Sequence, residues 1–326
     1  MRKSTKIWLL TAASLIALGA VSFTATACAI GWDFTKFSTV TLETNTYEVT
    51  DDFQNVSMNT NTADVVFLPS DDGICKVVCH EDVKEKHSVV VENGTLNVQA
   101  VNNRAWYDYL TVTGSGDSNI TVYLPQTQYG ALTMETDTGD VKIPKDFTFD
   151  SANIKGSTCD VEFSAAVQNS LTVKVSTGDI TLENLSASAV EVTVSTGIIK
   201  ASSITIENGL TTTASTGDTE LTNVTCTSYT HSSSSGEVKM NNVIVSEKMH
   251  IKVSTGDVKF DRCDAGEIYI KTSTGDVEGS LLTEKKFHAD SNTGKVHTPD
   301  SKVGETCEIV TSTGDIFITL AVNVNE

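Results

Sequence analysis

The stretch Val173-Lys-Val-Ser-Thr-Gly-Asp-Ile-Thr-Leu182 decides the fold of this chain. Its Ser-Thr-Gly-Asp core, or a close variant, occurs ten times with a spacing of 19 or 20 residues. A period of this length is too regular for chance and too short for a helix pair or a propeller blade. The glycine position of the repeat is occupied, in order, by Gly139, Cys159, Gly178, Gly197, Gly217, Gly236, Gly256, Gly275, Gly294 and Gly314.

Apolar residues alternate with polar ones on both sides of this position. In the repeat around Gly178 they are Leu171, Val173, Val175, Ile180 and Leu182. A third apolar position follows near the seventh residue after the glycine, as in Leu185, Ile204, Val224, Val243 and Leu282. Alternation at every second residue is typical of a strand with one buried face. Each repeat is therefore predicted to be a strand, a tight turn, a second strand and a bend.

One such repeat cannot bury its own apolar face, so it is stable only between similar neighbours. Equivalent side chains would then lie about 4.8 Å apart, which makes ten coils roughly 50 Å long. The sequence predicts an all-β fold, namely a single-chain parallel β-solenoid (β-helix) with 19–20 residues per coil and an N-terminal hydrophobic helix. Right-handed coiling is expected, because parallel crossover connections almost always turn that way.

The turn of each repeat has its own chemistry. Ser and Thr hydroxyls hydrogen-bond local backbone in turns, and Gly supplies the positive φ that a sharp reversal needs. The nine glycines of the repeat position are accordingly predicted to be structural turn residues. Cys159 occupies this position in one repeat, which predicts a strained or differently shaped turn there.

The residue after the glycine is acidic in eight repeats. In one interpretation, Asp is a turn residue that bonds its own backbone. In the other, carboxylates about 4.8 Å apart form a ladder that a cation such as calcium bridges. The glycine-rich nonapeptide of calcium-loaded β-rolls is absent, so no cofactor is predicted and calcium is kept as an option. The acidic residues are Asp140, Asp160, Asp179, Asp218, Glu237, Asp257, Asp276 and Asp315, and the exceptions are Ile198 and Lys295.

Composition and charge agree with an exported β protein. The chain of 326 residues has four prolines and 6% aromatic residues, and its net charge is −19. Nucleic-acid binding would need a basic stripe, so this function class is excluded. An acidic surface of this kind is typical of a protein that is soluble outside the cell.

Residues 1–33 are predicted to be a signal-anchor or signal peptide. Arg2, Lys3 and Lys6 precede an uncharged run from Ile7 to Trp32, which is long enough to span a bilayer. We expect a single-pass anchor in the bacterial cell membrane, with the body facing outside. Alternatively, Ala25-Thr26-Ala27 fits a signal peptidase site and gives a secreted protein, or Cys28 is the lipidated cysteine of a lipoprotein.

The body is expected to divide into irregular N-terminal β coils or a cap (residues 34–128) and regular solenoid repeats (residues 129–326). Ala63-Asp64 matches the repeat with alanine in the glycine position. Asn93-Gly94 also lies between alternating apolar residues, although the same dipeptide fits a plain hairpin.

The other residue types that carry chemistry form no predicted catalytic or metal site. The seven cysteines show no zinc-type pairing, and most are expected to be small buried residues. Arg262 with Asp261 and Asp264 is interpreted as a solvated triplet at a bend.

Two groups of histidines have distinct predicted settings. His250, Tyr269 and His288 are predicted to form an outward column on three consecutive coils. His231, which points inward beside Ser233, predicts a locally polar core.

The Ser-Thr-Gly-Asp-Val/Ile repeats, the hydrophobic N-terminus and the segment Thr60-Asn61-Thr62-Ala63-Asp64-Val65 together resemble the bacterial putative adhesin family, over roughly residues 50–320. The resemblance implies an envelope β-solenoid with no established catalytic residues.

The predicted function is a non-enzymatic cell-surface module that acts in adhesion, scaffolding or sensing. Its expected partners are the membrane, a cell-surface or cell-wall ligand and a second copy, which would bind at the solenoid end formed by the last repeat in the sequence. The alternatives are a polysaccharide-active β-helix enzyme and an accessory protein of an envelope-stress response.

Overall fold

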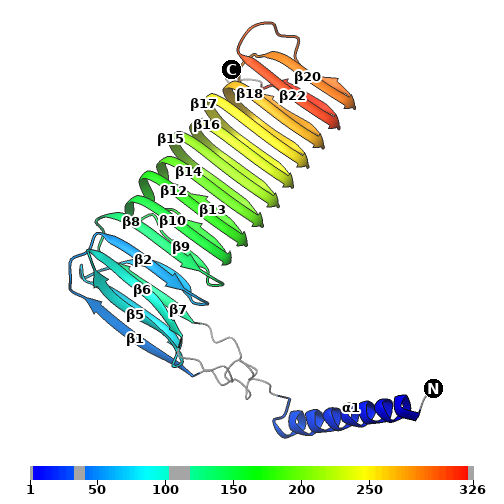
Figure 1. The fold of residues 1–326 in the computed structure, drawn as a ribbon. Helices are drawn as coiled ribbons and strands as arrows, with labels where there is room; N and C mark the ends of the chain where they lie inside the picture. The colour runs from blue at the N-terminus through cyan, green and yellow to red at the C-terminus, as the bar shows by residue number, and fades with distance from the viewer. Residues whose placement is uncertain (1–2, 33–40, 103–117, 322–326) are drawn as a thin grey trace.

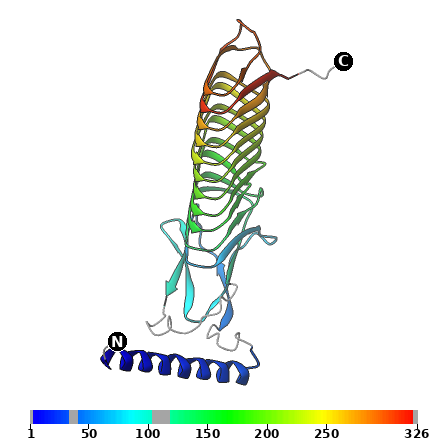
Figure 2. The ribbon, with the colours of Figure 1, turned by 90° about the vertical axis from the view of Figure 1, so that its right-hand side faces the viewer.

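The computed structural model describes residues 3–32, 41–102 and 118–321, which form one helix and a single 23-stranded sheet. The helix α1 (Lys3–Ala29) begins with Lys3 and Lys6 and carries no charged residue after them. The strands wind into a long stack of coils, and Figures 1 and 2 show this stack from two sides.

The regular coils confirm the predicted parallel β-solenoid. Val173 lies beside Ile154 of the preceding coil and Val192 of the following coil, so equivalent repeat positions are hydrogen-bonded neighbours. The strands are β8 (Gln128–Thr136), β9 (Val141–Ile143), β10 (Thr148–Thr158), β11 (Val161–Phe163), β12 (Ala166–Thr177), β13 (Ile180–Glu183), β14 (Ser186–Thr196), β15 (Ile199–Thr216), β16 (Thr219–Ser235), β17 (Val238–Thr255), β18 (Val258–Thr274) and β19 (Val277–Leu281).

The interior of these coils is mainly aliphatic, with some aromatic side chains and a few buried polar ones. Val173, Ile180 and Leu182 are each 0% exposed, and their counterparts in neighbouring coils are buried in the same way. Full burial of one such side chain stabilises the fold by about 1.5–3 kcal/mol. Every coil therefore adds to one continuous core.

Most corners need glycine for steric reasons. Eight of the nine glycines predicted as turn residues have positive φ, and Gly139 is the exception. Gly197 has a φ of 145°, and a Cβ there would collide with the carbonyl oxygen of Gly178 in the preceding coil. Cys159 is absent from the residues with positive φ, and its sulfur occupies the space over Gly156. The Cys159 corner is thus differently shaped, as the sequence predicts.

A second bend follows six residues after the glycine. Its residues adopt left-handed backbone conformations, with φ between 48° and 55°, which Asn tolerates better than most residues. The residue directly after the bend is buried in these coils. In the Gly275 coil the buried residue is Leu281 instead, and Leu282, which was expected at this position, is 40% exposed. The bend residues are Asn184, Ser203, Asn223, Asn242 and Arg262.

The coils at the C-terminal end do not stack in sequence order. β22 (Thr306–Thr313) pairs with β18, and β23 (Ile316–Leu320) pairs with β19, so the Gly314 coil follows the Gly275 coil directly. β20 (Lys286–Thr293) and β21 (Val296–His297) lie beyond them and pair with β22 and β23. The expectation that the last repeat in sequence forms the solenoid end is therefore wrong. The end is the Gly294 coil, as Figure 1 shows at β20.

At the other end, the first coils are parallel and the outermost strands are antiparallel. β2 (Asn55–Thr60) and β3 (Asp64–Pro69) stack on β8 and β9, and Ala63 takes the glycine position as predicted. β6 (Thr95–Asn102) and β7 (Asn119–Leu124) stack next in parallel. β5 (Glu85–Glu92) and β4 (Cys75–Asp82) then pair with them in antiparallel fashion, and β1 (Leu42–Val49) pairs with β4.

The Asn93-Gly94 dipeptide forms the turn between β5 and β6. Both residues have positive φ, 52° and 71°, and Glu92 lies opposite Thr95. The hairpin alternative is therefore confirmed, and the interpretation of this dipeptide as a solenoid corner is wrong.

Candidate functional site

The acidic column binds backbone of the adjacent coil. The Asp140 carboxylate accepts a hydrogen bond from the Asp160 N–H at 2.8 Å, and the Asp160 carboxylate accepts one from the Asp179 N–H at 2.7 Å. The interpretation that each Asp bonds its own backbone is therefore wrong. Asp64, Asp179, Asp218, Asp257, Asp276 and Asp315 make the same inter-coil bond. Calcium binding along this column stays a prediction.

Glu237 departs from this pattern. Its longer side chain makes ion pairs with Lys239 at 2.7 Å and Lys259 at 2.8 Å. The two lysines line a shallow groove of about 530 Å³ together with Glu220, Asn241, Asp261 and Glu278. This groove lies on the strands that follow the corner, and it carries charges of both signs.

A second groove, of about 620 Å³, lies on the strands that precede the corner. The rings of His250 and Tyr269 stack there at 4.6 Å, and Lys248 pairs with Glu267 at 3.0 Å beside them. Glu308 belongs to the Gly314 coil, which stacks between the Gly275 and Gly294 coils, and it therefore lies between Tyr269 and His288. The predicted column of His250, Tyr269 and His288 on consecutive coils is therefore wrong at its third member. We call this surface, made by Thr230, Lys248, His250, Glu267, Tyr269 and Glu308, the aromatic groove.

Arg262 is not part of a convergent site. Its guanidinium lies 3.6 Å from Asp261, and the two side chains are 60% and 61% exposed. Asp264 instead pairs with the buried Lys285 at 2.8 Å. The interpretation of the triplet as solvated and located at a bend is confirmed for Arg262 and Asp261.

The predicted polar core around His231 is present. His231 Nδ1 lies 2.8 Å from the Thr212 hydroxyl, which lies 3.2 Å from the Tyr229 hydroxyl, and all three residues are buried. Burial lowers the pKa of the His231 imidazole to about 4, so this histidine is neutral at pH 7.

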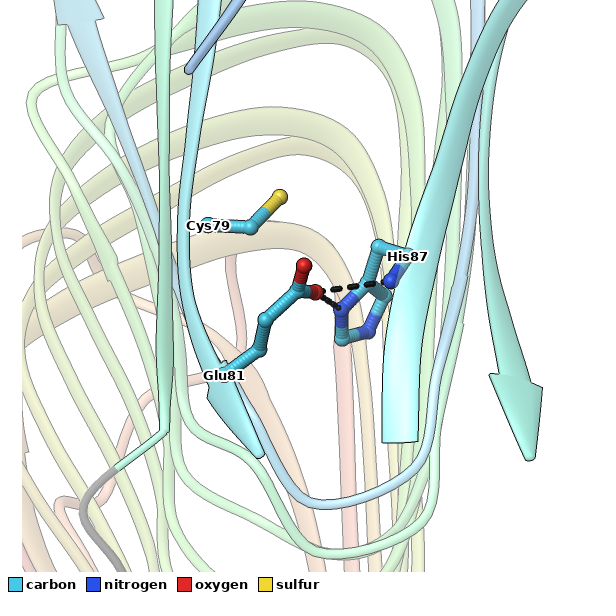
Figure 3. A group of neighbouring side chains, drawn as sticks. All are labelled: Cys79, Glu81 and His87. Atoms are coloured by element: carbon cyan, nitrogen blue, oxygen red, sulfur yellow. Dashed lines mark hydrogen bonds and ion pairs between the residues drawn. The ribbon is translucent and has the colours of Figure 1, made fainter. Parts of the chain in front are cut away.

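A second buried polar cluster lies at the antiparallel end, and the sequence interpretation missed it. Cys79 and Glu81 extend from β4 toward His87 on β5, as Figure 3 shows. Their potential ligand atoms lie within 4.8 Å of one another, and the three residues are 0%, 1% and 5% exposed. We call Cys79, Glu81 and His87 the end cluster.

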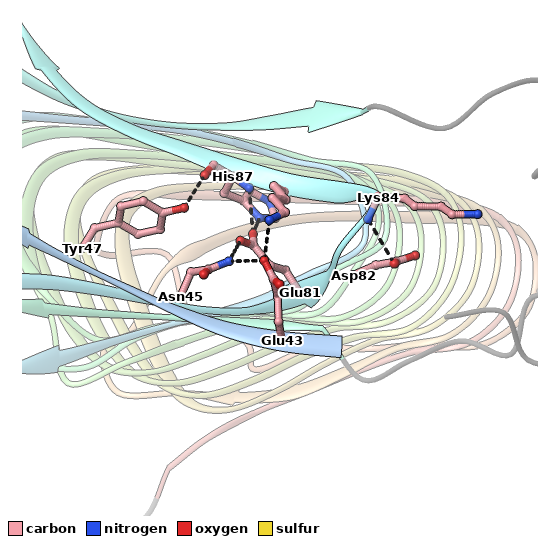
Figure 4. A network of polar contacts seen from close by, with 8 residues as sticks. Glu43, Asn45, Tyr47, Glu81, Asp82, Lys84 and His87 are labelled. Atoms are coloured by element: carbon pink, nitrogen blue, oxygen red, sulfur yellow. Dashed lines mark hydrogen bonds and ion pairs between the residues drawn. The ribbon is translucent and has the colours of Figure 1, made fainter. Parts of the chain in front are cut away.

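Hydrogen bonds hold the Glu81 carboxylate in place. One oxygen accepts from the His87 backbone N–H and from His87 Nδ1, both at 2.7 Å, and the other accepts from Asn45 Nδ2 at 2.8 Å. Figure 4 shows these side chains pointing toward one another, with Tyr47 donating to the His87 carbonyl at 3.1 Å. Because a carboxylate only accepts, His87 carries its proton on Nδ1.

The signal for this cluster in the sequence is weak. Cys79 and Glu81 are two residues apart on one strand face, and His87 follows a short turn. None of the three belongs to the repeat, so no column of equivalent residues marks them. Cys75 lies on the same face of β4 and is also buried, as are the other cysteines of the body.

A model of the Toastrack family DUF4097 matches residues 53–319. The chain belongs to this family. The match extends from the first parallel strand of the solenoid to its last strand. No curated protein matches the chain.

The chain matches several solved structures of bacterial proteins. A structure described as a putative adhesin from Parabacteroides distasonis ATCC 8503 is 12% identical, covers 86% of this chain and 98% of its own, and has a TM-score of 0.50. A putative adhesin from Bacteroides fragilis NCTC 9343 is 13% identical, with 86% and 97% coverage and a TM-score of 0.41. A putative lipid binding protein from Parabacteroides distasonis is 13% identical, with 85% and 97% coverage and a TM-score of 0.31. At this identity, the first likeness concerns the fold alone.

Proposed function

We propose that this Toastrack protein is a non-enzymatic module of the bacterial cell envelope, held at the membrane by α1 and binding a cell-wall or cell-surface ligand along its coils. The observation that carries the proposal is the aromatic groove, where outward side chains of neighbouring coils form a continuous polar and aromatic surface. Long solenoid faces of this kind suit extended ligands, because each coil adds a similar contact.

The helix α1 supports the tether. Thr5–Ala29 has a mean hydropathy of 1.9 and is long enough to cross a membrane, and none of its most apolar window is buried in the protein. The basic residues before it would remain in the cytoplasm and the body would lie outside. Cleavage after Ala27 or lipidation of Cys28 would also export the body. Mass spectrometry of the intact membrane-extracted protein distinguishes the three, and a mass lacking residues 1–27 would contradict the uncleaved anchor.

The charge of the body favours a neutral ligand over a polyanion. The chain carries 42 acidic against 23 basic residues, three of them before the apolar run. A surface of this sign repels anionic polymers. A neutral glycan can instead stack on the exposed edge of the His250–Tyr269 pair and bond to Glu308, Thr230 and Lys248, which face the same groove.

Glycan binding by the full-length protein in detergent tests this proposal. We expect binding to neutral cell-wall glycans that falls at least tenfold in Tyr269→Ala and is unchanged in Asn241→Ala, which alters the other groove. Equal binding by Tyr269→Ala would contradict the aromatic groove as the contact surface. Release of sugar products that stops in Arg262→Ala would show an enzyme and contradict the non-enzymatic function.

Self-association at the solenoid end is a separate part of the proposal. β20 pairs with β22 on one side, and it has no second strand partner among the described residues. Unpaired strand edges template pairing with another chain. Sedimentation of the protein should show a dimer that Ser291→Pro weakens, since this substitution alters the edge strand.

A further inference from the structure

We propose that the end cluster is a binding site for a divalent transition-metal ion of the zinc class, with Cys79 sulfur, a Glu81 carboxylate oxygen and His87 nitrogen as ligands. The site is independent of the surface function proposed above, since it lies inside the antiparallel end of the solenoid.

The donor set is the first argument. Thiolate, imidazole and carboxylate are the three ligand types that zinc takes in proteins, and three protein ligands leave one position for water. The ligand atoms of Cys79, Glu81 and His87 lie within 4.8 Å of one another. Ligands of one tetrahedral zinc lie about 3.3–3.8 Å apart, given metal–ligand distances of about 2.0–2.3 Å. Small rotations of these side chains therefore suffice.

Charge balance is the second argument. A Cys79 thiolate and the Glu81 carboxylate together neutralise a divalent ion, so the occupied site has no net charge. This matters because the cluster is almost fully buried, and an uncompensated charge there would be costly.

The support around the ligands is the third argument. Asn45 donates to Glu81 at 2.8 Å and to Glu43 at 2.8 Å, and Glu43 lies at the surface with a side chain 35% exposed. Residues that orient ligands in this way are a general feature of metal sites.

The burial of the end cluster argues against a catalytic site. Cys79, Glu81 and His87 would also suit a nucleophile with a base, but no substrate reaches a cysteine that is 0% exposed. A single ion is small enough to enter when the β4–β5 hairpin opens locally. On binding, the Cys79 thiol proton goes to solvent and the His87 ring proton moves from Nδ1 to Nε2, which has no hydrogen-bond partner among the described atoms. Metal binding therefore releases about one proton per ion.

The test is titration of the full-length metal-free protein in detergent with zinc and cobalt chloride. We expect one ion per chain, a sulfur-to-cobalt charge-transfer band and a higher Tm with zinc. Cys79→Ser should abolish the charge-transfer band and weaken zinc binding more than 100-fold. Asn45→Ala, which removes a residue that orients a ligand, should weaken it about 10–100-fold.

Cys75→Ser is the matched control. Cys75 lies on the same strand and face as Cys79 and is also buried, but it is not in the end cluster. We expect Cys75→Ser to bind zinc as the natural chain does. Absence of stoichiometric zinc binding by the natural chain, or equal loss in Cys75→Ser and Cys79→Ser, would overturn the proposal.

If Cys79→Ser does not fold, X-ray absorption spectroscopy of the zinc-loaded natural chain still tests the proposal. One sulfur with nitrogen and oxygen neighbours is expected around zinc, and a shell without sulfur overturns the proposal. Since this measurement does not involve glycans, its failure is distinguishable from failure of the proposed surface function.

Discussion

The regular coils and the antiparallel end of this protein each bury a histidine, and the two histidines differ in the groups that surround the ring. His231 lies among the stacked coils, its ring bonds the hydroxyl of Thr212 and no other group of the described residues, and it is neutral at pH 7. His87 lies at the antiparallel end against a carboxylate, Glu81, and beside a thiol, Cys79. The histidine in the coils therefore has a neutral hydroxyl as its partner, whereas the histidine at the end faces a carboxylate and a thiol.

Chain geometry explains this difference. In the coils, the inward position of His231 lies about 4.8 Å from Thr212 on one side and from Ile251 on the other, and neither neighbour could compensate a charge on the ring. At the antiparallel end, β4 and β5 turn back on each other, which brings Glu81 and His87 together from two strands. The repeated coils form the aliphatic core, and the end cluster lies where the repeat is interrupted.

The largest expected effect comes from the corners. In Gly197→Ala, the new Cβ collides with the Gly178 carbonyl in a backbone conformation that L residues avoid, and we expect a loss of about 3–4 kcal/mol in the free energy of unfolding. Gly94→Ala at the antiparallel end meets no atom within 4 Å and should cost about 1 kcal/mol. Chemical denaturation measures both values, and equal losses would show that the corner is not tightly stacked.

The buried His231 should make the coils sensitive to acid. Its pKa is lowered from 6.5 to about 4 by burial, so the unfolded chain takes up a proton before the folded one. The stabilisation from the neutral ring is present above pH 6.5 and is lost as the pH falls through about 4. Between pH 7 and 4.5 this amounts to about 2.5 kcal/mol.

Unfolding of the natural chain and His231→Gln at both pH values isolates this contribution. Gln does not titrate in this range, so the variant should lose about 2.5 kcal/mol less than the natural chain. The same acid dependence in both chains would show that His231 does not carry it.

The smallest effect concerns the acidic column, which continues from the coils into the N-terminal end. Asp179→Ala removes the acceptor for the Ile198 N–H, and Asp64→Ala removes the acceptor for the Asp140 N–H. Each should cost about 1 kcal/mol, since each removes one hydrogen bond, while the corresponding Asn variants should cost less. A loss in Asp179→Ala without one in Asp64→Ala would place the boundary of regular stacking at β8 rather than at β3.

The sequence predicts the coils well because the same pattern of buried strand residues and corner residues recurs in each of them. The corner of Gly178, the buried faces of Val173 and Ile180, and the polar core at His231 all follow from a residue's position in the repeat. Even Ala63, outside the regular array, is recognised by the same template.

What lies outside the repeat could not be predicted from spacing. The spacing of the repeats is the same whether the Gly294 coil or the Gly314 coil lies next to the Gly275 coil. The exchanged order at the C-terminal end therefore cannot be inferred from the spacing. Asn93-Gly94 suits a corner and a hairpin alike until its partner strand is known. Glu81 and His87 are brought together by that same antiparallel pairing, and therefore the end cluster became visible only in three dimensions.

Distances between nitroxide labels on the exposed corner threonines test the stacked parallel solenoid most directly, in a background where Cys28 is replaced by Ser. Thr177 and Thr274 are five coils apart, which predicts about 24 Å between their backbones. Thr274 should lie closer to Thr313, its direct neighbour, than to Thr293, which is one coil farther away. A much longer distance between Thr177 and Thr274 would contradict the solenoid, and the reverse order at Thr293 and Thr313 would contradict the exchanged coils.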